Sequence, residues 1–372
     1  MFAVQIAHLR IENFRQFADL DLDFTDSLGR VRDLVVLVGP NASGKTTVLD
    51  AIAAAISPLT RIRCLRSDFH LRPSMVRRGA LHARVTCSVR FSEDEVLASR
   101  ELARILEADP PADLPKHEAE VVWEYPDPQD KFRTGRATLT FGYDSAFHFL
   151  SRYRVAKALR TGKVNHGWFE RAGAVFTFDQ QRTGMGKTIR RDLIDIIEGA
   201  APDPSDPDDD RRRTDPQTLL LAMAVESLLP AASGKTAESQ FAEVQQRYAQ
   251  LCAPRKIVGA IRPVQGPPEM RFSDGVNEYD SGGMCSGEQM MLVFLLRMVT
   301  ERIHRSIVLV DEIELHQHPV WQRKLLHLLP RMGEGNQVIL TTHSPYVRDA
   351  SPAGSVVTLG ELGEVPARGQ VP

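Results

Sequence analysis

Hydrophobic and polar positions alternate along two short runs near the start of the chain, residues 4–11 and 18–24. A period of two predicts strands with one buried and one exposed face, and the exposed face of the second run carries its carboxylates. The next run, 33–38, is almost wholly apolar, which is typical of a strand in the middle of a covered parallel sheet. After a glycine-rich turn, apolar spacing over 46–56 predicts a helix, and Pro58 predicts its end.

Strands and helices share the rest of the chain. Strands are expected at 83–91, within 119–143, and at 174–178, 256–264, 269–272, 306–310, 337–342 and 355–359. Helices are expected at 93–107, 145–171, 216–229, 237–251, 287–303 and 319–331. Residues 202–215 hold prolines, aspartates and three arginines but no apolar side chain, which predicts a surface loop or a disordered segment. The sequence has no internal repeat and no sustained heptad pattern, so an α/β fold without a coiled-coil arm is predicted.

The strongest chemical motif lies in the turn between the run 33–38 and the helix that follows it. Its residues fit the pattern G-x-x-x-x-G-K-[ST] and are Gly39, Pro40, Asn41, Ala42, Ser43, Gly44, Lys45 and Thr46. A strand before and a helix after this turn are the context of a phosphate-binding loop, because glycines let backbone N–H groups wrap phosphates at a helix N-terminus. Lys45 is expected to neutralise the β- and γ-phosphates, and the Thr46 hydroxyl to bind Mg²⁺. ATP and Mg²⁺ are the expected ligands.

A second motif follows the apolar run 306–310, where Asp311 and Glu312 come next. In a P-loop ATPase, the first carboxylate after a buried strand holds Mg²⁺ and the second polarises the attacking water. Asp311 lies 266 positions after Lys45, so a long segment is inserted between the two motifs. Two solvated acids at a strand end are the alternative, and the phosphate loop argues against it.

Further segments complete a family pattern. Ser286-Gly287-Glu288-Gln289 precedes an apolar helix, and His343 follows the strand 337–342. With residues 9–15 and 314–319, these segments resemble the ABC-type ATPase heads of the SMC/RecF/OLD-like branch, often grouped as AAA family ATPases. The resemblance covers both ends of the chain well and residues 60–280 weakly. It implies a P-loop NTPase of the α/β class, a two-lobed ABC-ATPase head with a helical insertion.

The resemblance also implies roles for single residues. The phosphate loop and Thr47 would bind the nucleotide, and Lys45, Glu312 and His343 would be catalytic, with His343 the switch histidine at the γ-phosphate. Thr46 and Asp311 would bind the metal. Either Gln180 or Gln181 would be the Q-loop glutamine, and the choice between them is open.

The segment Ser286–Gln289, called the signature below, implies a dimer. Ser286, Gly287 and Glu288 belong to the nucleotide-binding set, and Ser286 and Gly287 would reach the γ-phosphate of a partner subunit. ATP would then be sandwiched in a head-to-tail homodimer, and further assembly of dimers is left open. Along the chain, 1–175 would form lobe I with a β-rich, basic insertion, 176–290 the Q-loop and helical insert, and 291–372 lobe II.

Charge adds a candidate partner. With 46 Lys and Arg against 48 Asp and Glu among 372 residues, the net charge of -2 gives no global signal for polyanion binding. Residues 61–90, however, hold eight arginines and one acid, and 152–171 add six basic residues against Glu170. Such local patches favour contact with the phosphates of double-stranded DNA. The equal alternative is that the arginines pair with acidic partner surfaces or are simply solvated.

Several classes of protein are disfavoured. The four cysteines lack the spacing of a zinc site, no signal peptide or membrane-spanning stretch is seen, and a cytoplasmic protein without membrane contact is expected. The S-G-E-Q signature departs from the S-G-G-Q of transporter domains. Only 29 residues follow His343, too few for a nuclease domain, so a nuclease effector would be a separate chain.

The expected function is an ATPase whose dimer closure is coupled to DNA sensing and to such an effector, in prokaryotic antiphage defence. A RecF-like DNA repair or recombination clamp is the first alternative. An ATPase subunit that regulates a partner protein without DNA contact is the second.

Overall fold

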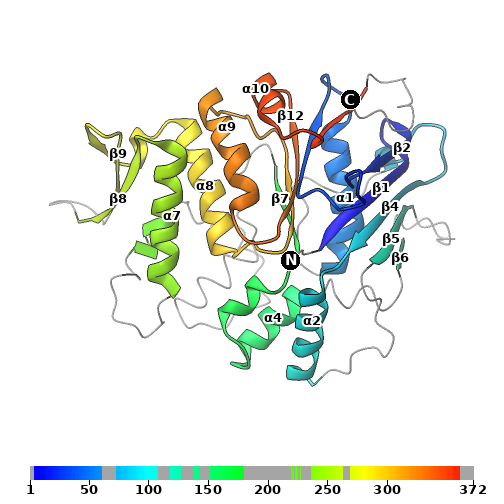
Figure 1. Cartoon of the computed structure of the whole chain (residues 1–372), viewed down its shortest axis with the longest axis horizontal. Helices are drawn as coiled ribbons and strands as arrows, with labels where there is room; N and C mark the ends of the chain where they lie inside the picture. The colour runs from blue at the N-terminus through cyan, green and yellow to red at the C-terminus, as the bar shows by residue number, and fades with distance from the viewer. Residues whose placement is uncertain are drawn as a thin grey trace. The chain divides into compact units, whose positions relative to one another are not determined.

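The computed structural model describes residues 4–60, 73–107, 118–126, 138–141, 151–179, 219–221, 223–224, 227, 236–262 and 269–360 (Figure 1). The chain divides into two compact units that alternate along the sequence. The first comprises Met1–Gln180, Ile303–Glu314 and Leu326–Pro372, and the second comprises Gln181–Arg302 and Leu315–Leu325. Among the described residues, no helix is both long and apolar enough to span a bilayer.

An antiparallel sheet in the first unit has the strand order β2-β1-β4-β5-β6. The strands are β1 (Gln5–Phe14), β2 (Phe17–Asp23), β4 (Ala83–Arg90), β5 (Glu118–Tyr125) and β6 (Thr138–Phe141). The predicted alternation is confirmed in β2, where Leu20 and Leu22 are buried and the aspartates between and beside them are exposed. The face of β2 that carries Leu20 and Leu22 therefore packs into the hydrophobic core.

A parallel sheet in the same unit has the order β13-β3-β12-β11-β7. Its strands are β3 (Leu34–Val38), β7 (Val175–Phe178), β11 (Ile307–Val310), β12 (Gln337–Thr342) and β13 (Val356–Thr358). Every residue of β3, β11 and β12 is buried, as the continuous apolar runs predict. The buried side chain of Gln337 links the two sheets, because it accepts a hydrogen bond from the Ile6 N–H at 2.7 Å and donates to the Ile6 carbonyl at 2.9 Å.

Helix α1 (Lys45–Thr60) packs on both sheets and completes the core of the first unit (Figure 1). Val48 and Ile52 are fully buried, and each such side chain contributes about 1.5–3 kcal/mol relative to an exposed one. The predicted end of this helix at Pro58 is wrong, because the helix runs to Thr60. Proline cannot donate a backbone hydrogen bond, but its fixed φ is compatible with a helix. The last turn of α1 can therefore contain Pro58.

Three shorter helical elements also belong to the first unit: α2 (Glu93–Ile105), α4 (Ser151–Arg160) and the 3-10 turn η2 (His166–Glu170). The single helix predicted over 145–171 is wrong in its described part, which is divided into α4 and η2. Gly162 adopts a φ of 66° between them, and Asn165 caps η2 by accepting from the Gly167 N–H at 3.0 Å. The short helix α10 (Pro345–Ala350) and the turn η1 (Pro73–Met75) were not predicted, since such short elements show no period. The helix predicted over 319–331 ends as the 3-10 turn η5 (Leu329–Arg331).

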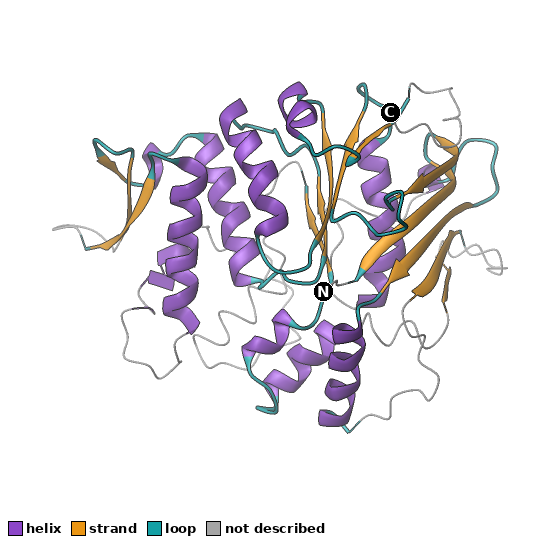
Figure 2. Cartoon of the chain, viewed as in Figure 1, coloured by secondary structure: helices purple, strands orange, loops and turns teal. Residues whose placement is uncertain are grey.

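The second unit is mostly helical (Figure 2). Helix α7 (Thr236–Cys252) packs on α8 (Ser286–Thr300), and α9 (Pro319–Leu328) begins in this unit and ends in the first. The described residues between 219 and 227 are also helical. A small antiparallel sheet consists of β8 (Lys256–Ile261), β9 (Glu269–Ser273) and β10 (Glu278–Tyr279), followed by the turn η4 (Ser281–Gly283). Strand β10 was not predicted, because two residues carry no alternation.

Candidate active site

The carboxyl ends of three parallel strands bring the predicted motifs to one edge of the sheet. The phosphate loop follows β3, Asp311 and Glu312 follow β11, and His343 follows β12. Because parallel neighbours end at the same edge, residues 298 positions apart in sequence come into contact here. Strand β7 ends at this edge as well, but Gln180 and Gln181, which follow it in sequence, lie outside the described residues.

The phosphate loop is a tight turn that depends on its glycines. Gly44 has a φ of 98°, and a Cβ there would lie 2.3 Å from the Phe17 ring, so only glycine fits. A Cβ on Gly39 would lie 2.6 Å from the Leu359 carbonyl oxygen and from Ser43 Oγ. Pro40, Asn41 and Ala42 form the exposed tip of the loop, and Ser43 is buried beneath it.

The turn between β1 and β2 packs behind this loop. Gln16 Oε1 accepts a hydrogen bond from the Thr47 hydroxyl at 3.1 Å, and Arg15 pairs with Asp50 at 2.6 Å. Thr47 therefore faces the β1–β2 turn. The family pattern of the sequence stops at Arg15, which is why Gln16 was not among the predicted residues.

The Lys45 ammonium lies among acceptors at the start of α1. Its Nζ donates to the carbonyl oxygens of Gly39 and Pro40, each at 2.9 Å, and lies 3.4 Å from Nδ1 of His343. Burial lowers the pKa of Lys45, and the negative charges of Glu312, Glu314 and Asp311 work in the opposite direction. Among the described residues of this edge, the Lys45 ammonium thus lies near the carboxylates of Glu312, Glu314 and Asp311.

Thr46 and Asp311 meet directly. The Thr46 hydroxyl donates to Asp311, 2.9 Å from Oδ1 and 3.1 Å from Oδ2. Asp311 Oδ1 also accepts from the Thr341 hydroxyl at 2.7 Å, and the carboxylate is 1% exposed. The two residues predicted to bind a metal are therefore adjacent, although they come from opposite ends of the sequence.

These donors fit Mg²⁺. A hydroxyl and a carboxylate are hard oxygen ligands, which this cation prefers, and it takes only one or two protein ligands when phosphate oxygens and waters supply the rest. Thr341 fixes the orientation of the Asp311 carboxylate, as residues around a metal site do. The hydrogen bond between Thr46 and Asp311 is therefore the observation that supports a Mg²⁺ site here.

Glu312 has an unusual backbone. Its φ of 47° is left-handed, a conformation that costs a non-glycine residue about 1–3 kcal/mol, and its N–H donates to Thr341 Oγ1 at 2.8 Å. Burial raises the pKa of Glu312, the nearby charges of Asp311 and Glu314 raise it further, and His343 and Lys45 oppose the shift. A half-buried carboxylate with a raised pKa is suited to accept a proton.

Glu314 supports the predicted switch histidine. Its carboxylate accepts from the Thr342 hydroxyl at 2.8 Å and from the His343 N–H at 2.5 Å. The backbone of His343 is thereby fixed, while its side chain is exposed at the site. The sequence placed Glu314 in a family segment without assigning it a role, since only the sheet order brings it to His343.

The signature residues belong to the second unit and differ in accessibility. Ser286 is exposed at the first position of α8, and Gly287 is buried, with its carbonyl accepting from Gln317 Nε2 at 3.2 Å. Glu288 points inward, and its side chain is 3% exposed. Its carboxylate oxygens accept hydrogen bonds from residues of its own unit, whereas the neighbouring Ser286 is exposed.

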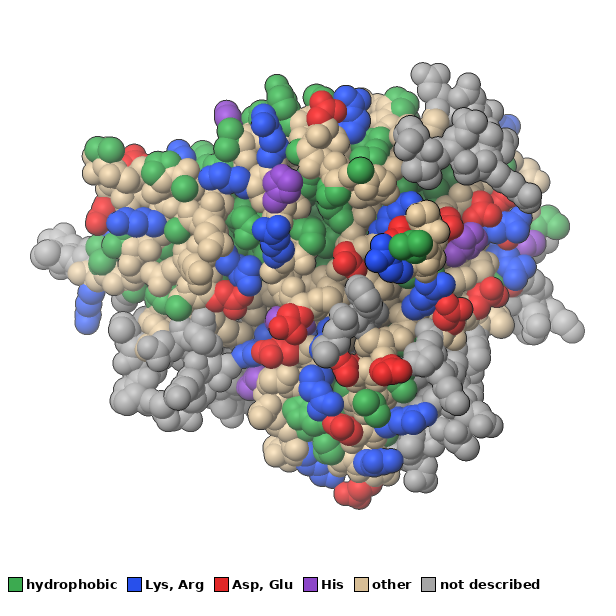
Figure 3. Space-filling model, in the orientation of Figure 1, with side chains coloured by type: hydrophobic (Ala, Val, Ile, Leu, Met, Phe, Trp, Pro, Cys, Tyr) green, Lys and Arg blue, Asp and Glu red, His purple; other side chains and the backbone are tan. Residues whose placement is uncertain are grey.

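Many cations of the two basic stretches are paired. Arg90 lies 2.5 Å from Glu118, and Arg171 lies 2.9 Å from Glu101. Arg152 is buried and donates to the carbonyl oxygens of Phe169 and Ala172 rather than facing solvent. On the face shown in Figure 3, basic and acidic side chains lie intermixed over the first unit.

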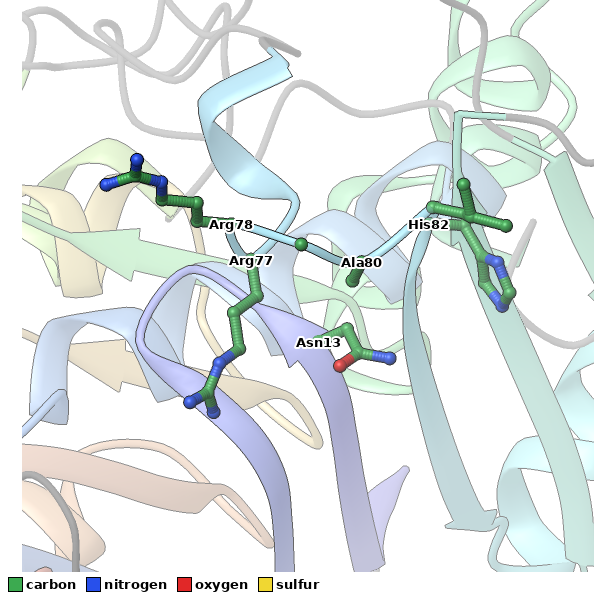
Figure 4. Close-up of a pocket in the computed structure, with 7 residues that line it drawn as sticks. Asn13, Arg77, Arg78, Ala80 and His82 are labelled. Carbon is green, nitrogen blue, oxygen red and sulfur yellow. The ribbon is translucent and has the colours of Figure 1, made fainter.

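The exposed basic residues Arg77 and Arg78 line a surface hollow of about 480 Å³ with Asn13 and His82 (Figure 4). In this view Arg77, Asn13 and His82 extend to one side of the turn, and Arg78 extends away from it. Among the described residues, no acidic side chain pairs with Arg77 or Arg78. Lys157 and Arg160 of the second basic stretch are also exposed, and Arg61, Arg63, Arg66 and Arg72 lie outside the described residues.

Two family models match the chain. The model "AAA domain, putative AbiEii toxin, Type IV TA system" matches residues 281–349, and the model "AAA domain" matches residues 8–95. The first segment contains the signature, the Asp-Glu pair and the histidine, and the second contains the phosphate loop. Both motif-bearing ends of the chain therefore match AAA-domain models.

Curated relatives match short stretches. The chain is 37% identical over 57 residues to the Septu protein PtuA of Bacillus thuringiensis, covering 15% of this chain and 14% of that protein. It is 51% identical over 42 residues to the Retron Ec83 probable ATPase of Escherichia coli, covering 11% and 8%. It is 39% identical over 78 residues to the DNA double-strand break repair Rad50 ATPase of Methanopyrus kandleri, covering 21% and 7%. The matched stretches span at most 14% of the length of these relatives.

A solved structure matches nearly the whole fold. The Smc head domain of Pyrococcus furiosus, with an extended coiled coil and bound to the C-terminal domain of ScpA, aligns with a TM-score of 0.51 at 14% identity. The alignment covers 95% of this chain and 93% of that one, which shows a shared fold. The predicted fold class and resemblance are confirmed: the chain has the fold of an SMC head, and both of its motif-bearing ends match AAA-domain models.

Proposed function

We propose that the chain binds ATP with Mg²⁺ at the carboxyl edge of the parallel sheet and hydrolyses it within a head-to-tail homodimer. The observation that carries this proposal is the hydrogen bond between Thr46 and Asp311 beside Lys45. It joins the two motifs that P-loop ATPases use together, and it does so at the edge where α/β sheets bind ligands.

Each residue at this edge has a proposed task. The phosphate loop and Lys45 bind the phosphates, and Thr46 with Asp311 would hold Mg²⁺, which supplies neutralisation of phosphate charge. Glu312 accepts a proton from the attacking water, for which its raised pKa is suited. His343 lies against Lys45 and contacts the γ-phosphate, and Glu314 holds its backbone in place. Gln180 or Gln181 completes the site.

The dimer follows from the signature. Ser286 is exposed at the N-terminus of the 15-residue helix α8, where backbone N–H groups and the helix dipole favour an anion. We expect Ser286 and Gly287 to reach the γ-phosphate of a partner subunit, so that ATP closes the dimer and hydrolysis opens it.

Coupling to a separate effector in prokaryotic antiphage defence is supported by the likeness to a Septu protein and a retron ATPase. Dimer closure would then switch a partner chain, such as a nuclease, between two states. This part of the proposal rests on short matched stretches, and the partner is to be found by co-purification.

DNA contact is proposed at the Arg77–Arg78 turn. The backbone N–H of Arg77 donates to the Asn13 carbonyl at 2.8 Å. Asn13 precedes the β1–β2 turn, which packs behind the phosphate loop. A phosphate backbone bound here would lie next to an element that contacts the ATP site. The likeness to a Rad50 repair ATPase favours a RecF-like clamp as the second candidate, and both candidates need this DNA contact.

The Glu312→Gln variant tests the ATPase proposal. Removal of the base should lower the hydrolysis rate by about 10²–10⁴-fold while ATP binding persists, so the variant should accumulate as an ATP-bound dimer on size exclusion. The wild-type rate should rise with pH through the raised pKa of Glu312, because only the deprotonated form accepts a proton. Lys45→Ala is the contrasting variant and should lose ATP binding. Near wild-type hydrolysis by Glu312→Gln would remove Glu312 from this role.

A further inference from the structure

The Glu288 carboxylate is the centre of a buried cluster in the second unit. Its Oε1 accepts from the Tyr279 hydroxyl at 2.7 Å and the Tyr248 hydroxyl at 3.3 Å, and pairs with Arg255 Nε at 2.7 Å. Its Oε2 accepts from the N–H of Cys285, the residue before α8, at 2.9 Å. One carboxylate therefore connects α7, the segment after it, strand β10 and the start of the signature helix.

The segment before α9 contacts the same end of α8. The Arg255 guanidinium lies over the Trp321 ring, 5.4 Å from its centroid. Gln317 Nε2 donates to the Gly287 carbonyl, and a Cβ on Gly287 would lie only 2.6 Å from the His316 carbonyl oxygen. The first turn of α8 is thus held both by the Glu288 cluster and by the backbone that follows the Asp-Glu pair.

We propose that Glu288 is a positioning residue that fixes the first turn of α8, and with it Ser286, in the orientation that meets the nucleotide of a partner subunit. This inference rests on the proposed head-to-tail dimer. It assigns Glu288 a task other than direct nucleotide contact, because all of its contacts lie within its own unit.

A charged carboxylate suits this task better than a neutral side chain. Burial alone would raise the pKa of Glu288, but the hydrogen bonds from Tyr279 and Cys285 and the charge of Arg255 outweigh burial, and the pKa lies below its usual value. The group is therefore ionised at neutral pH and balances Arg255. A glutamine keeps the volume and can still accept a hydrogen bond, but it leaves the arginine unbalanced.

The same helix offers a matched control. Glu301, at the other end of α8, has a side chain 2% exposed and pairs with Arg297 Nε at 2.9 Å. Glu301→Gln therefore removes a buried carboxylate–arginine pair of the same kind, from the same helix, away from the signature. A merely structural role for Glu288 predicts the same consequences for both variants.

The experiment measures ATP affinity, thermal unfolding and hydrolysis for the full chain and for equimolar mixtures with Lys45→Ala. Glu288→Gln should lower hydrolysis about 10-fold or more, and Glu301→Gln should stay within about 2-fold of wild type, with ATP affinity unchanged in both. Mixing Glu288→Gln with Lys45→Ala should restore up to about a quarter of the wild-type rate, because one composite site then pairs an intact Lys45 with an intact signature.

The outcomes separate the inference from the proposed function. The reference mixture is Ser286→Arg with Lys45→Ala, and its failure to regain activity would overturn the dimer and, with it, the role of Glu288. If the reference regains activity but the Glu288→Gln mixture does not, or if Glu301→Gln loses as much activity, the positioning role alone is overturned. Should Glu288→Gln not fold, Tyr279→Phe removes one hydrogen bond to the same carboxylate and should lower hydrolysis about 3-fold with ATP affinity unchanged, and a wild-type rate for this variant would overturn the positioning role.

Discussion

The Thr46 hydroxyl donates a hydrogen bond to the Asp311 carboxylate at 2.9 Å across 265 positions of sequence. Thr341 donates to the same carboxylate, so Asp311 is held from two sides. These contacts need the β3-β12-β11 strand order, because Thr341 lies in β12, between the strands that lead to Thr46 and Asp311.

Thr46→Val should therefore weaken metal-dependent hydrolysis without unfolding the chain. Asp311 keeps its bond from Thr341 but loses the hydroxyl that would share the metal, so we expect the rate to fall about 10-fold or more and the Mg²⁺ concentration for half-maximal rate to rise. Hydrolysis measured against Mg²⁺ tests this. Thr86→Val, on β4 of the antiparallel sheet, is the control. Identical Mg²⁺ curves for the two variants would contradict a metal role for Thr46.

Ser286→Arg should leave ATP binding by the isolated subunit intact but block closure of the dimer. The arginine would occupy the space at the start of α8 that the partner's phosphate needs, so hydrolysis should fall about 10²-fold or more. Light scattering with ATP reports closure, and wild type is expected to dimerise under conditions where the variant remains a monomer. Full hydrolysis by Ser286→Arg alone would show that the signature does not act on a partner.

Reversal of Arg77 and Arg78 to glutamate should weaken duplex binding and flatten its dependence on salt. For every DNA phosphate that the protein no longer binds, the log–log salt slope should fall by about 0.9, while ATP affinity stays unchanged. Duplex affinity is measured against salt, with and without a non-hydrolysable ATP analogue, and Arg331→Glu serves as a control at another exposed arginine of the first unit. If wild type shows no salt-dependent DNA binding in either state, the turn is a protein interface.

Glu95 should make stability depend on pH. This carboxyl is 1% exposed near the start of α2, and burial raises its pKa to about 8, although Arg305 and the N–H groups of Gly173 and Val4 oppose the shift. The folded state keeps a proton that the unfolded state releases near pH 4.5, so stability should fall as pH rises from there to about 8, by up to about 1.4 kcal/mol per pH unit.

Glu95→Gln removes this titration, so its stability relative to wild type should increase from pH 6 to pH 8. Urea unfolding at the two pH values measures the difference. Glu93→Gln, an exposed acid in the same helical turn, should leave the wild-type slope unchanged. Parallel pH dependences for wild type and Glu95→Gln would show that Glu95 does not cause the slope.

Much of the site could be predicted from sequence because its motifs are local. The phosphate loop needs glycines at fixed spacing between a strand and a helix, and the Asp-Glu pair needs only a preceding apolar strand. Gly44, whose φ and surroundings exclude any side chain, shows why that spacing is so restrictive. The alternation in β2 and the apolar run of β3 likewise report which faces are buried, since periodicity reflects burial along a single element.

The surroundings of several charged side chains depend on which elements the fold brings together. The sequence placed Glu288 among the nucleotide-binding residues, but contacts from α7, the segment after it and β10 turn its carboxylate inward. It placed Arg90 and Arg171 in basic stretches, but acids from β5 and α2 pair with both.

Periodicity and motif spacing act over a few residues, whereas strand order joins segments hundreds of positions apart. Composition and local pattern therefore determined the fold class and the chemistry at the ends of the strands. Only the tertiary structure decided which charges remain exposed and which are neutralised, because a charge is neutralised by whatever partner the fold brings within a few ångströms.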